Sequence, residues 1–196
     1  MKNWLMILGV GSCLVSCVNH TVDTKMNASR KTQIKEMCYQ DVVVPKELLI
    51  SLAEPAYGTN KDIVGDVSAK TKDEGTAVAL RTITLYQKEI HDSMINQMRL
   101  YDVKFNHCSK AGSNSPYSLQ FVIHRAFAER APNRMYKTGV GVNVKIFEKG
   151  QTNAVWESEY VSGTEAALGD AEKAHVDGFA KKIVWQLYQS DWLEKR

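Results

Sequence analysis

Apolar side chains recur at helical spacing over residues 83–101, and this stripe limits the possible folds more than any other feature of the chain. Spacings of three and four residues mark one face of an α-helix, and charged and amide side chains fall between the stripe residues. We therefore predict a helix over about residues 76–100, N-capped by Thr76, that buries one face against a partner surface. The stripe consists of Ile83, Tyr86, Ile90, Met94, Met98 and Tyr101.

Alternation of period two predicts three strands after this helix. The second strand spans about residues 140–146, the third spans 154–161, and residues 148–151 between them fit a tight hairpin turn. In the first strand, alternation places five side chains on one face: Leu119, Phe121, Ile123, Arg125 and Phe127. The three strands predict an antiparallel meander with one face available for helices.

Two further elements complete the predicted fold. Residues 42–53 suggest an early strand that is broken or bent at Pro45, and residues 170–192 carry a second amphipathic stripe that Asp170 can cap. The order of strand, helix, meander and helix favours an α+β domain. We expect an antiparallel sheet with two amphipathic helices packed on one face, preceded by a signal peptide and a flexible tether.

The first residues of the chain have the composition of an export signal. Lys2 provides a positive charge, Trp4 to Val10 form an apolar run, and the small-residue site Leu14 to Ser16 precedes Cys17. The apolar run is shorter than the roughly 20 residues that a membrane-spanning helix needs, which disfavours an uncleaved anchor. An ordinary secretory peptide remains an alternative.

This leader resembles a bacterial lipoprotein signal with its lipobox. The resemblance implies cleavage before Cys17 and acylation of the Cys17 thiol, with palmitate among the attached chains. The residue after Cys17 is Val18 rather than an aspartate. In this respect the chain resembles lipoproteins that are sorted to the outer membrane and face the periplasm. We accordingly divide the chain into a signal peptide (1–16), a lipidated cysteine with a polar tether (17–37) and a single periplasmic domain (38–196).

The remaining cysteines fit an oxidising compartment. Cys13 leaves with the leader, so a processed chain keeps Cys38 and Cys108 besides Cys17. An even pair in an exported domain suggests one disulfide that joins the start of the domain to its middle. The alternative is two separate buried thiols, because sequence does not reveal the distance between the α-carbons.

Charge and motifs argue against several functional classes. A formal net charge of +3 gives no electrostatic footprint for nucleic acid. The histidines have no metal-ligand spacing, and no nucleophile or phosphate-binding motif is present, so we predict no metal, no cofactor and no catalytic residue. The five histidines are His20, His91, His107, His124 and His175.

Two glycines interrupt the second predicted strand. Gly139 and Gly141 imitate the start of a dinucleotide-binding fingerprint, but the third glycine and the following helix are missing. Glycine inside a strand usually marks a bulge or a close approach of another group to the backbone. We predict either a bulge or such an approach at Gly139 and Gly141.

Basic side chains are concentrated around the connection between the first two strands of the meander. They offer a contact surface for an anionic partner, such as a lipid head group or an acidic protein patch. Arginine and tyrosine are enriched at interfaces, although a solvated loop is the simpler interpretation. The predicted partner-binding residues are Arg125, Arg130, Arg134, Tyr136 and Lys137.

The chain from about Leu48 to Leu193 resembles small bacterial envelope lipoproteins. The pattern is carried by LYQKEIHDSMINQMRLYDVKF, VGVNVKIFEKGQTNAVWESEY and DGFAKKIVWQLYQ. Similar proteins are the auxiliary lipoproteins of lipid-transport ABC systems, the lipoprotein of the lipopolysaccharide translocon and lipoprotein activators of penicillin-binding proteins. The resemblance implies a non-catalytic accessory or scaffold protein, bound to the membrane through Cys17 and to an envelope complex. The alternatives are an envelope hydrolase with a spatially assembled site and a small-ligand or lipid carrier.

Overall fold

A computed structural model of the protein describes residues 24–26, 33–46, 48–53, 69–110, 114–130, 136–165 and 170–194. Cys17 and the leader lie outside these residues. The elements in chain order are β1 (Thr24–Met26), β2 (Glu36–Tyr39), β3 (Leu49–Ala53), α1 (Ala69–Met98), the 3-10 helix η1 (Arg99–Tyr101), β4 (Lys104–His107), β5 (Tyr117–Arg130), β6 (Tyr136–Glu148), β7 (Ala154–Glu165) and α2 (Asp170–Gln189).

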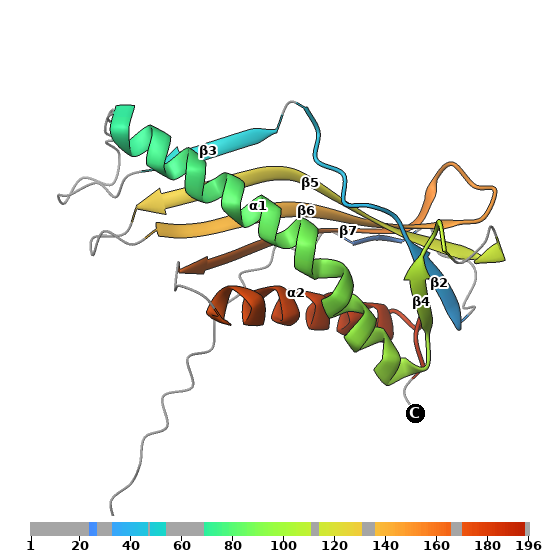
Figure 1. Cartoon of the computed structure of the whole chain (residues 1–196). Helices are drawn as coiled ribbons and strands as arrows, with labels where there is room; N and C mark the ends of the chain where they lie inside the picture. Colours follow the sequence, from blue (N-terminus) through green and yellow to red (C-terminus); the bar gives the residue numbers. More distant parts are fainter. Residues whose placement is uncertain are drawn as a thin grey trace, which may run out of the picture.

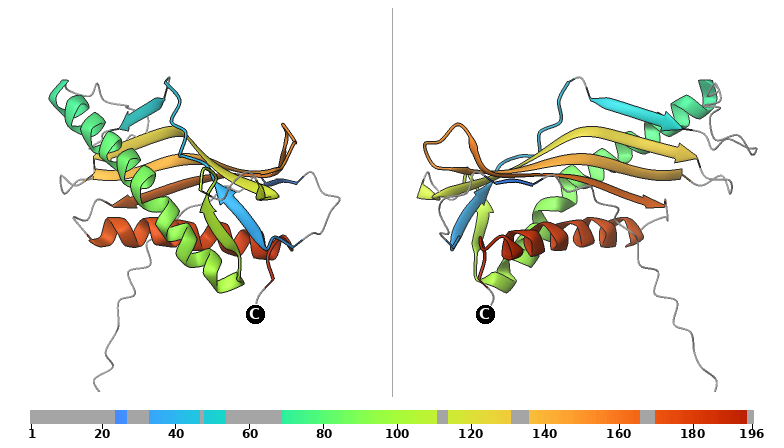
Figure 2. Two further views of the ribbon diagram at one scale, coloured as in Figure 1. Left: turned by 45° about the vertical axis from the view of Figure 1, so that its right-hand side comes forward. Right: turned by 180° about the vertical axis from the view of Figure 1, so that it is seen from behind.

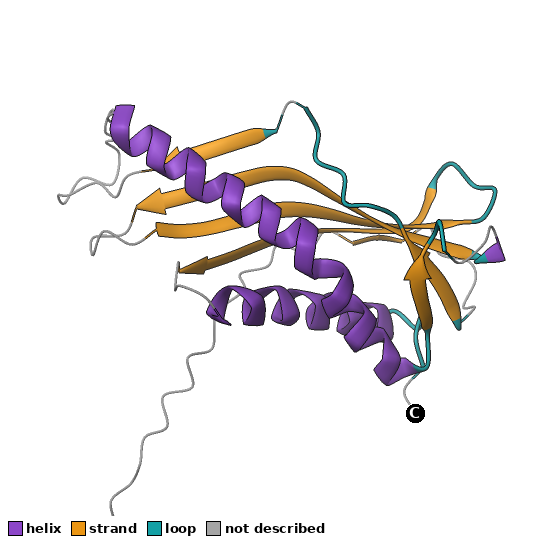
Figure 3. Ribbon diagram, in the orientation of Figure 1, coloured by secondary structure: helices purple, strands orange, loops and turns teal. Residues whose placement is uncertain are grey.

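The predicted α+β class is confirmed. Strands β5, β6 and β7 form the antiparallel meander at the centre of the sheet, and Gly150 takes a positive φ of 83° in the β6–β7 turn. Helices α1 and α2 cross each other on one face of this sheet (Figures 1 and 3). Seen from behind, strands β5 and β6 pass in front of α1 (Figure 2). We call the face opposite the helices the outer face.

Strands β2 and β3, which precede α1, run parallel to β5. β2 pairs with residues 118–119, Val43 bridges to Val122, and β3 pairs with residues 125–129, so the chain follows one edge of β5. The break expected at Pro45 separates Val43 from β3 and is confirmed. β4 adds beyond β2, also in parallel. The meander predicted from sequence is therefore one part of a larger mixed sheet.

The segment expected to be a tether contributes to the folded unit. β1 pairs with Trp156–Ser158 of β7, and β2 begins at Glu36, two residues before the predicted domain boundary. Ile34 is 2% exposed, and its amide donates to the carbonyl of Trp192 at 2.9 Å. The packed domain thus includes Ile34.

One apolar layer between the sheet and the helices forms the core. Strand side chains on the helix side alternate with polar side chains on the outer face, as predicted for residues 154–161: Trp156 and Tyr160 are fully buried, and Glu159 is exposed. Each large apolar side chain that is buried contributes about 1.5 to 3 kcal/mol. The stripe of α1 and the stripe of α2, which includes Val176, Phe179, Ile183 and Leu187, fill the same layer.

Helix α1 begins at Ala69, earlier than the predicted start at Thr76. Asp73 and Glu74 are exposed, so the first turns carry no apolar stripe although their residues support a helix. An apolar pattern marks only the part of a helix that is buried, which explains the late predicted start. Among the described residues, neither helix is long and apolar enough to cross a membrane.

A bulge in β5 changes which side chains face the helices. Ile123 lies opposite Val142 and Arg125 lies opposite Gly141, so His124 is an extra residue in β5. A bulge reverses the alternation beyond it. The prediction that Arg125 and Phe127 share a face with the core residue Ile123 is therefore wrong, and both lie on the outer face.

Candidate partner-binding site

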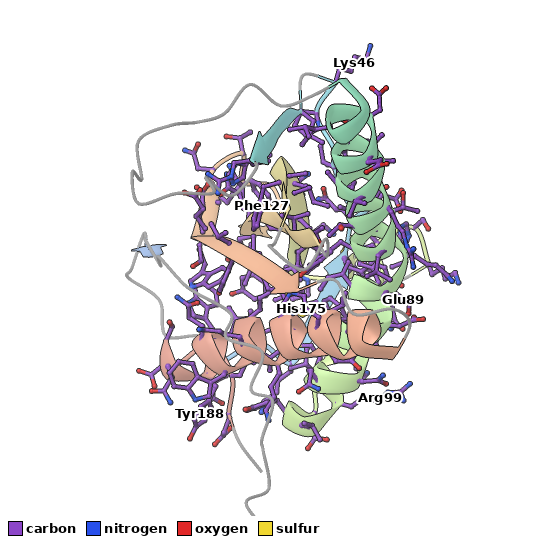
Figure 4. All side chains as sticks on the ribbon, turned by 90° about the vertical axis from the view of Figure 1, so that its left-hand side faces the viewer. Lys46, Glu89, Arg99, Phe127, His175 and Tyr188 are labelled. Carbon is purple, nitrogen blue, oxygen red and sulfur yellow. A yellow bond between two sulfur atoms is a disulfide. The ribbon has the colours of Figure 1, made fainter. Side chains whose placement is uncertain are left out.

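The outer-face site lies at the β5 bulge and consists of His124, Arg125, Phe127, Gly139 and Gly141. A Cβ atom on Gly139 would fall 2.2 Å from Cζ of Phe127, and one on Gly141 would fall 2.9 Å from Cε1 of His124. The two rings therefore cover glycine backbone, which confirms the close approach predicted from sequence. Phe127 is labelled in Figure 4, on the sheet and away from α2.

Arg125 is held against the ring of Phe127. Its guanidinium carbon lies 5.6 Å from the ring centroid, a cation–π distance. Its Nε is buried and has no hydrogen-bond partner among the described residues. A partly desolvated guanidinium without a carboxylate favours binding a carboxylate or phosphate, because its fork-shaped donors match those groups.

Other cations on the outer face already have acidic neighbours. Lys145 Nζ lies 3.0 Å from Glu157 Oε1, and His124 Nε2 lies 3.3 Å from Glu159 Oε1. Among the described side chains, Arg125 differs from Lys145 and His124 in having no acidic group within ion-pair distance.

The structure divides the predicted basic surface. The register pairs Arg130 with Tyr136 and Glu129 with Lys137 at the end of the sheet where β5 ends and β6 begins. Arg125 lies five positions before Arg130, roughly 17 Å along the strand. Arg134 lies outside the described residues, and so do the side chains of Arg130, Tyr136 and Lys137. Arg125 is thus separate from the other predicted residues.

The predicted disulfide is confirmed. Cys38 of β2 and Cys108, directly after β4, are bridged, and their α-carbons are 4.7 Å apart. The parallel pairing of Tyr39 with His107 brings the two cysteines together. The bridge therefore joins β2 to the turn that follows β4.

Sequence reasoning missed a buried polar cluster between the sheet and both helices. Ser162 Oγ of β7 lies 2.5 Å from the Tyr86 hydroxyl of α1 and 2.8 Å from His175 Nε2 of α2 (His175 is labelled in Figure 4). Burial raises the pKa of Tyr86 and lowers the pKa of His175. Ser162 is fully buried and cannot meet a substrate, so the cluster is structural. Three residues so far apart in sequence give no local signal.

A second histidine cluster lies at the surface beside the disulfide. His107 Nε2 is 3.0 Å from Asp41 Oδ1, and Nδ1 is 2.6 Å from Ser109 Oγ. The Ser109 amide also donates to Nδ1, so Nδ1 is the acceptor and Nε2 carries the proton that Asp41 accepts. The side chain of Asp41 is 91% exposed. Carboxylate, imidazole and hydroxyl are thus connected in the order used by serine hydrolases.

Metal binding finds no support in the described part of the chain, where no group of three or more His, Cys, Asp or Glu side chains is placed to hold an ion. His91 is stacked on Tyr39 with ring centroids 4.3 Å apart, and burial lowers its pKa. His91 therefore has a packing role.

Comparison with known proteins gives only distant likenesses. No family model matches the chain, and no curated protein matches it. Among solved structures, a PelC dodecamer from Paraburkholderia phytofirmans has a TM-score of 0.46 at 8% identity, covering 89% of this chain and 99% of that chain. A protein from Xanthomonas campestris assigned to DUF330 has a TM-score of 0.46 at 12% identity, covering 89% and 94%. Likeness at this level identifies neither a family nor a function.

Proposed function

We propose that the protein is a non-catalytic accessory protein of the bacterial cell envelope. In this proposal lipidated Cys17 anchors it in the outer membrane, the domain faces the periplasm, and the outer face of the sheet binds an acidic group of an envelope protein complex. The observation that carries the proposal is the placement of Arg125 by the bulge. Its guanidinium lies on Phe127 on the face that both helices leave open.

The test compares recovery of the partner by two charge-reversed variants. Proteins that co-purify with the detergent-extracted wild type after reversible cross-linking are identified by mass spectrometry. Arg125→Glu should lower recovery of the specific partner, because a carboxylate at this position repels an acidic group. Lys181→Glu makes the same charge change at an exposed position of α2 and should leave recovery unchanged.

Folding is checked by thermal unfolding of both variants. Recovery that is equal for Arg125→Glu and wild type, with both proteins folded, would contradict the proposed surface. Equal losses for the two variants would indicate a nonspecific effect of net charge and would also count against it.

The anchor has an independent test. Cys17→Ala should abolish incorporation of radiolabelled palmitate and leave the precursor unprocessed, because the acylated thiol is missing. A labelled band that persists in the variant would contradict anchoring at Cys17. Fractionation of the wild type on a density gradient then tests the outer-membrane location.

A hydrolase is the second candidate, favoured by the hydrogen-bonded series Asp41, His107 and Ser109. The discriminating probe is a fluorophosphonate, which reacts with activated serine hydroxyls. Under the leading proposal the protein stays unlabelled. Labelling that disappears in both Ser109→Ala and His107→Gln would favour the hydrolase instead.

A further inference from the structure

Trp185 of α2 is exposed, although tryptophan side chains are usually covered. Its exposed fraction is 53%, and it is the most exposed aromatic residue among the described side chains. Trp156, by contrast, is completely buried. An indole ring combines a large apolar surface with one N–H donor, so a ring left in water favours a boundary between an apolar and an aqueous phase.

The helical position of Trp185 directs its ring away from the sheet. Phe179, Ile183 and Leu187 of α2 are buried in the core between sheet and helices. Trp185 comes two residues after Ile183 and two before Leu187, and side chains two positions apart on an α-helix project roughly 200° apart. Trp185 therefore lies at the centre of the α2 face that is opposite the core.

Tyrosines extend this face from α2 to the end of α1. Tyr188 follows Trp185 by one helical turn and is half-buried. Its ring centroid lies 5.7 Å from that of Tyr101, which belongs to η1 directly after α1. Tyr188 lies below α2 in Figure 4, whereas Phe127 lies above it on the sheet. The aromatic groups are thus on the side of the molecule that the helices form.

Positive charge accompanies the exposed indole. Lys181 and Lys182 precede Trp185 by about one turn, and they are the only charged residues of α2 over positions 178–189. The acidic residue before them, Asp177, accepts a hydrogen bond from a serine hydroxyl of α1 and so is directed toward that helix. We call the following five residues the helix-side patch: Tyr101, Lys181, Lys182, Trp185 and Tyr188.

We propose that the helix-side patch rests on the anionic surface of a phospholipid bilayer, with the Trp185 ring at the level of the head groups. Tryptophan and tyrosine concentrate at this level, where the ring meets the apolar region and its polar atom meets water. Lysine adds attraction to anionic head groups. The inference rests on the proposed membrane anchoring, since the anchor brings the domain to the membrane and the patch sets which side faces it.

This orientation leaves the partner-binding side accessible. Arg125 lies on the outer face of the sheet, opposite both helices. With α2 on the bilayer, the outer face points away from the lipid. One side of the domain then contacts the membrane while the other binds the envelope partner.

A second protein is the competing occupant of the patch. A specific protein interface buries about 800 Å² on each partner, whereas the exposed part of one tryptophan offers on the order of 100 Å² of apolar surface. A membrane contact needs only a few amphipathic side chains when a lipid already holds the chain close, because two weak membrane signals together give stable binding. The size and the charge of the patch therefore favour a membrane.

Contact with lipid is tested by quenching of tryptophan emission. The whole mature chain with Cys17→Ser carries an N-terminal hexahistidine tag and is held on vesicles of nickel-chelating lipid, phosphatidylethanolamine, phosphatidylglycerol and a brominated phosphatidylcholine. Bromine quenches an indole that it touches. Subtracting the emission of the Trp185→Phe variant removes the contributions of Trp156 and Trp192. The remaining Trp185 emission should be quenched roughly twofold, as expected for a ring at the interface.

The matched control moves the tryptophan to the opposite side of the sheet. Asn143 of β6 lies between the buried residues Val142 and Val144, so its side chain is on the outer face. A chain with Asn143→Trp and Trp185→Phe should show no quenching beyond that of Trp185→Phe alone. Absence of quenching at position 185, or equal quenching at both positions, would overturn the proposal.

The two lysines have a test of their own. Lys181→Glu with Lys182→Glu should reduce the quenching of Trp185 to near the background, because the patch then repels phosphatidylglycerol. Lys46→Glu with Lys110→Glu makes the same charge change at exposed positions outside both helices and should leave the quenching in place. Unchanged quenching in the first pair, or equal losses in both pairs, would overturn the role of the patch in binding anionic lipid.

A further measurement identifies a protein occupant. Without vesicles, a blue shift of the Trp185 emission that grows with protein concentration would show that a second copy covers the patch, and it would overturn docking on lipid. Because the tag replaces the lipid, the vesicle test holds whether or not Cys17 is acylated, and failure of the anchor is distinguished from failure of the patch. Lys181→Glu stays a valid control for partner recovery, since the anchor keeps the chain at the membrane.

Discussion

The hydroxyl of Ser162 joins three elements that are far apart in the chain. It contacts Tyr86 on α1 and His175 on α2, all three groups being buried. Buried polar groups are costly without partners, so each of these groups depends on the other two. The cluster therefore fixes the position of both helices against β7 more specifically than apolar packing does.

Ser162→Ala should lower the free energy of unfolding by about 1 to 3 kcal/mol, because the Tyr86 hydroxyl and His175 Nε2 lose their shared partner. Urea unfolding followed by circular dichroism measures the loss. Ser158→Ala is the matched control: Ser158 lies on the same strand and face and is equally buried, but its hydroxyl is not part of the cluster that Ser162 forms with Tyr86 and His175. A loss for Ser158→Ala as large as that for Ser162→Ala would show that the cluster adds nothing.

Burial of His175 also predicts a dependence of stability on pH. Its pKa in the folded protein is lowered by desolvation below the 6.5 of an exposed histidine. Between these two values the unfolded chain binds more protons, so stability falls as pH decreases through that window and is fully present above it. His175→Gln, measured by urea unfolding from neutral to mildly acidic pH, should reduce this slope. Part of the pH dependence of stability should remain in this variant, because burial also lowers the pKa of His91. An unchanged slope would contradict the assignment to His175.

Sequence patterns at this scale predicted the Cys38–Cys108 bridge, because it follows from the cysteine composition. The position of Arg125 was not predictable in the same way. A single extra residue in β5 reverses the pattern, and no local rule locates the bulge at His124. The glycines opposite it signalled a close approach but not which ring makes it.

At the scale of elements, β6 depends on two glycines to different degrees. A Cβ on Gly139 would meet the Phe127 ring and the Ser162 carbonyl oxygen, at 2.3 Å, which belongs to backbone and cannot move aside. A Cβ on Gly141 would meet mainly the His124 ring, a side chain that can rotate.

Gly139→Ala should therefore destabilise the domain by about 3 kcal/mol or more, and Gly141→Ala by only about 1 kcal/mol. Gly178→Ala is the control, since nothing lies within 4 Å of its new Cβ and alanine favours a helix, so it should stabilise α2. Thermal melting ranks the three variants. If Gly141→Ala proved the more destabilising strand variant, the described packing of Phe127 would be wrong.

The helices and the meander were predictable because each has one buried face and a long periodic pattern. The flanking strands were not. β2 and β4 are four residues long, and their parallel pairing joins segments about 70 residues apart through contacts that local patterns do not encode.

At the scale of the whole molecule, the disulfide closes a loop with a sequence separation of 70 residues that contains all of α1. Cys38→Ser with Cys108→Ser should lower the free energy of unfolding by about 4 kcal/mol, chiefly because the unfolded chain gains freedom. Denaturant unfolding of the variant and of the reduced wild type should agree. A loss below about 1 kcal/mol would show that the bridge constrains a segment already ordered by β2 and β4.

The hydrogen bond from Ile34 to Trp192 has a consequence for biosynthesis. Residue 34 leaves the ribosome long before residue 192, so its buried position cannot form while the chain is growing. β2 must likewise wait for β4 and β5. Ile34 therefore stays without its native hydrogen bond until synthesis has passed residue 192, and the strands made first wait for partners that are made much later.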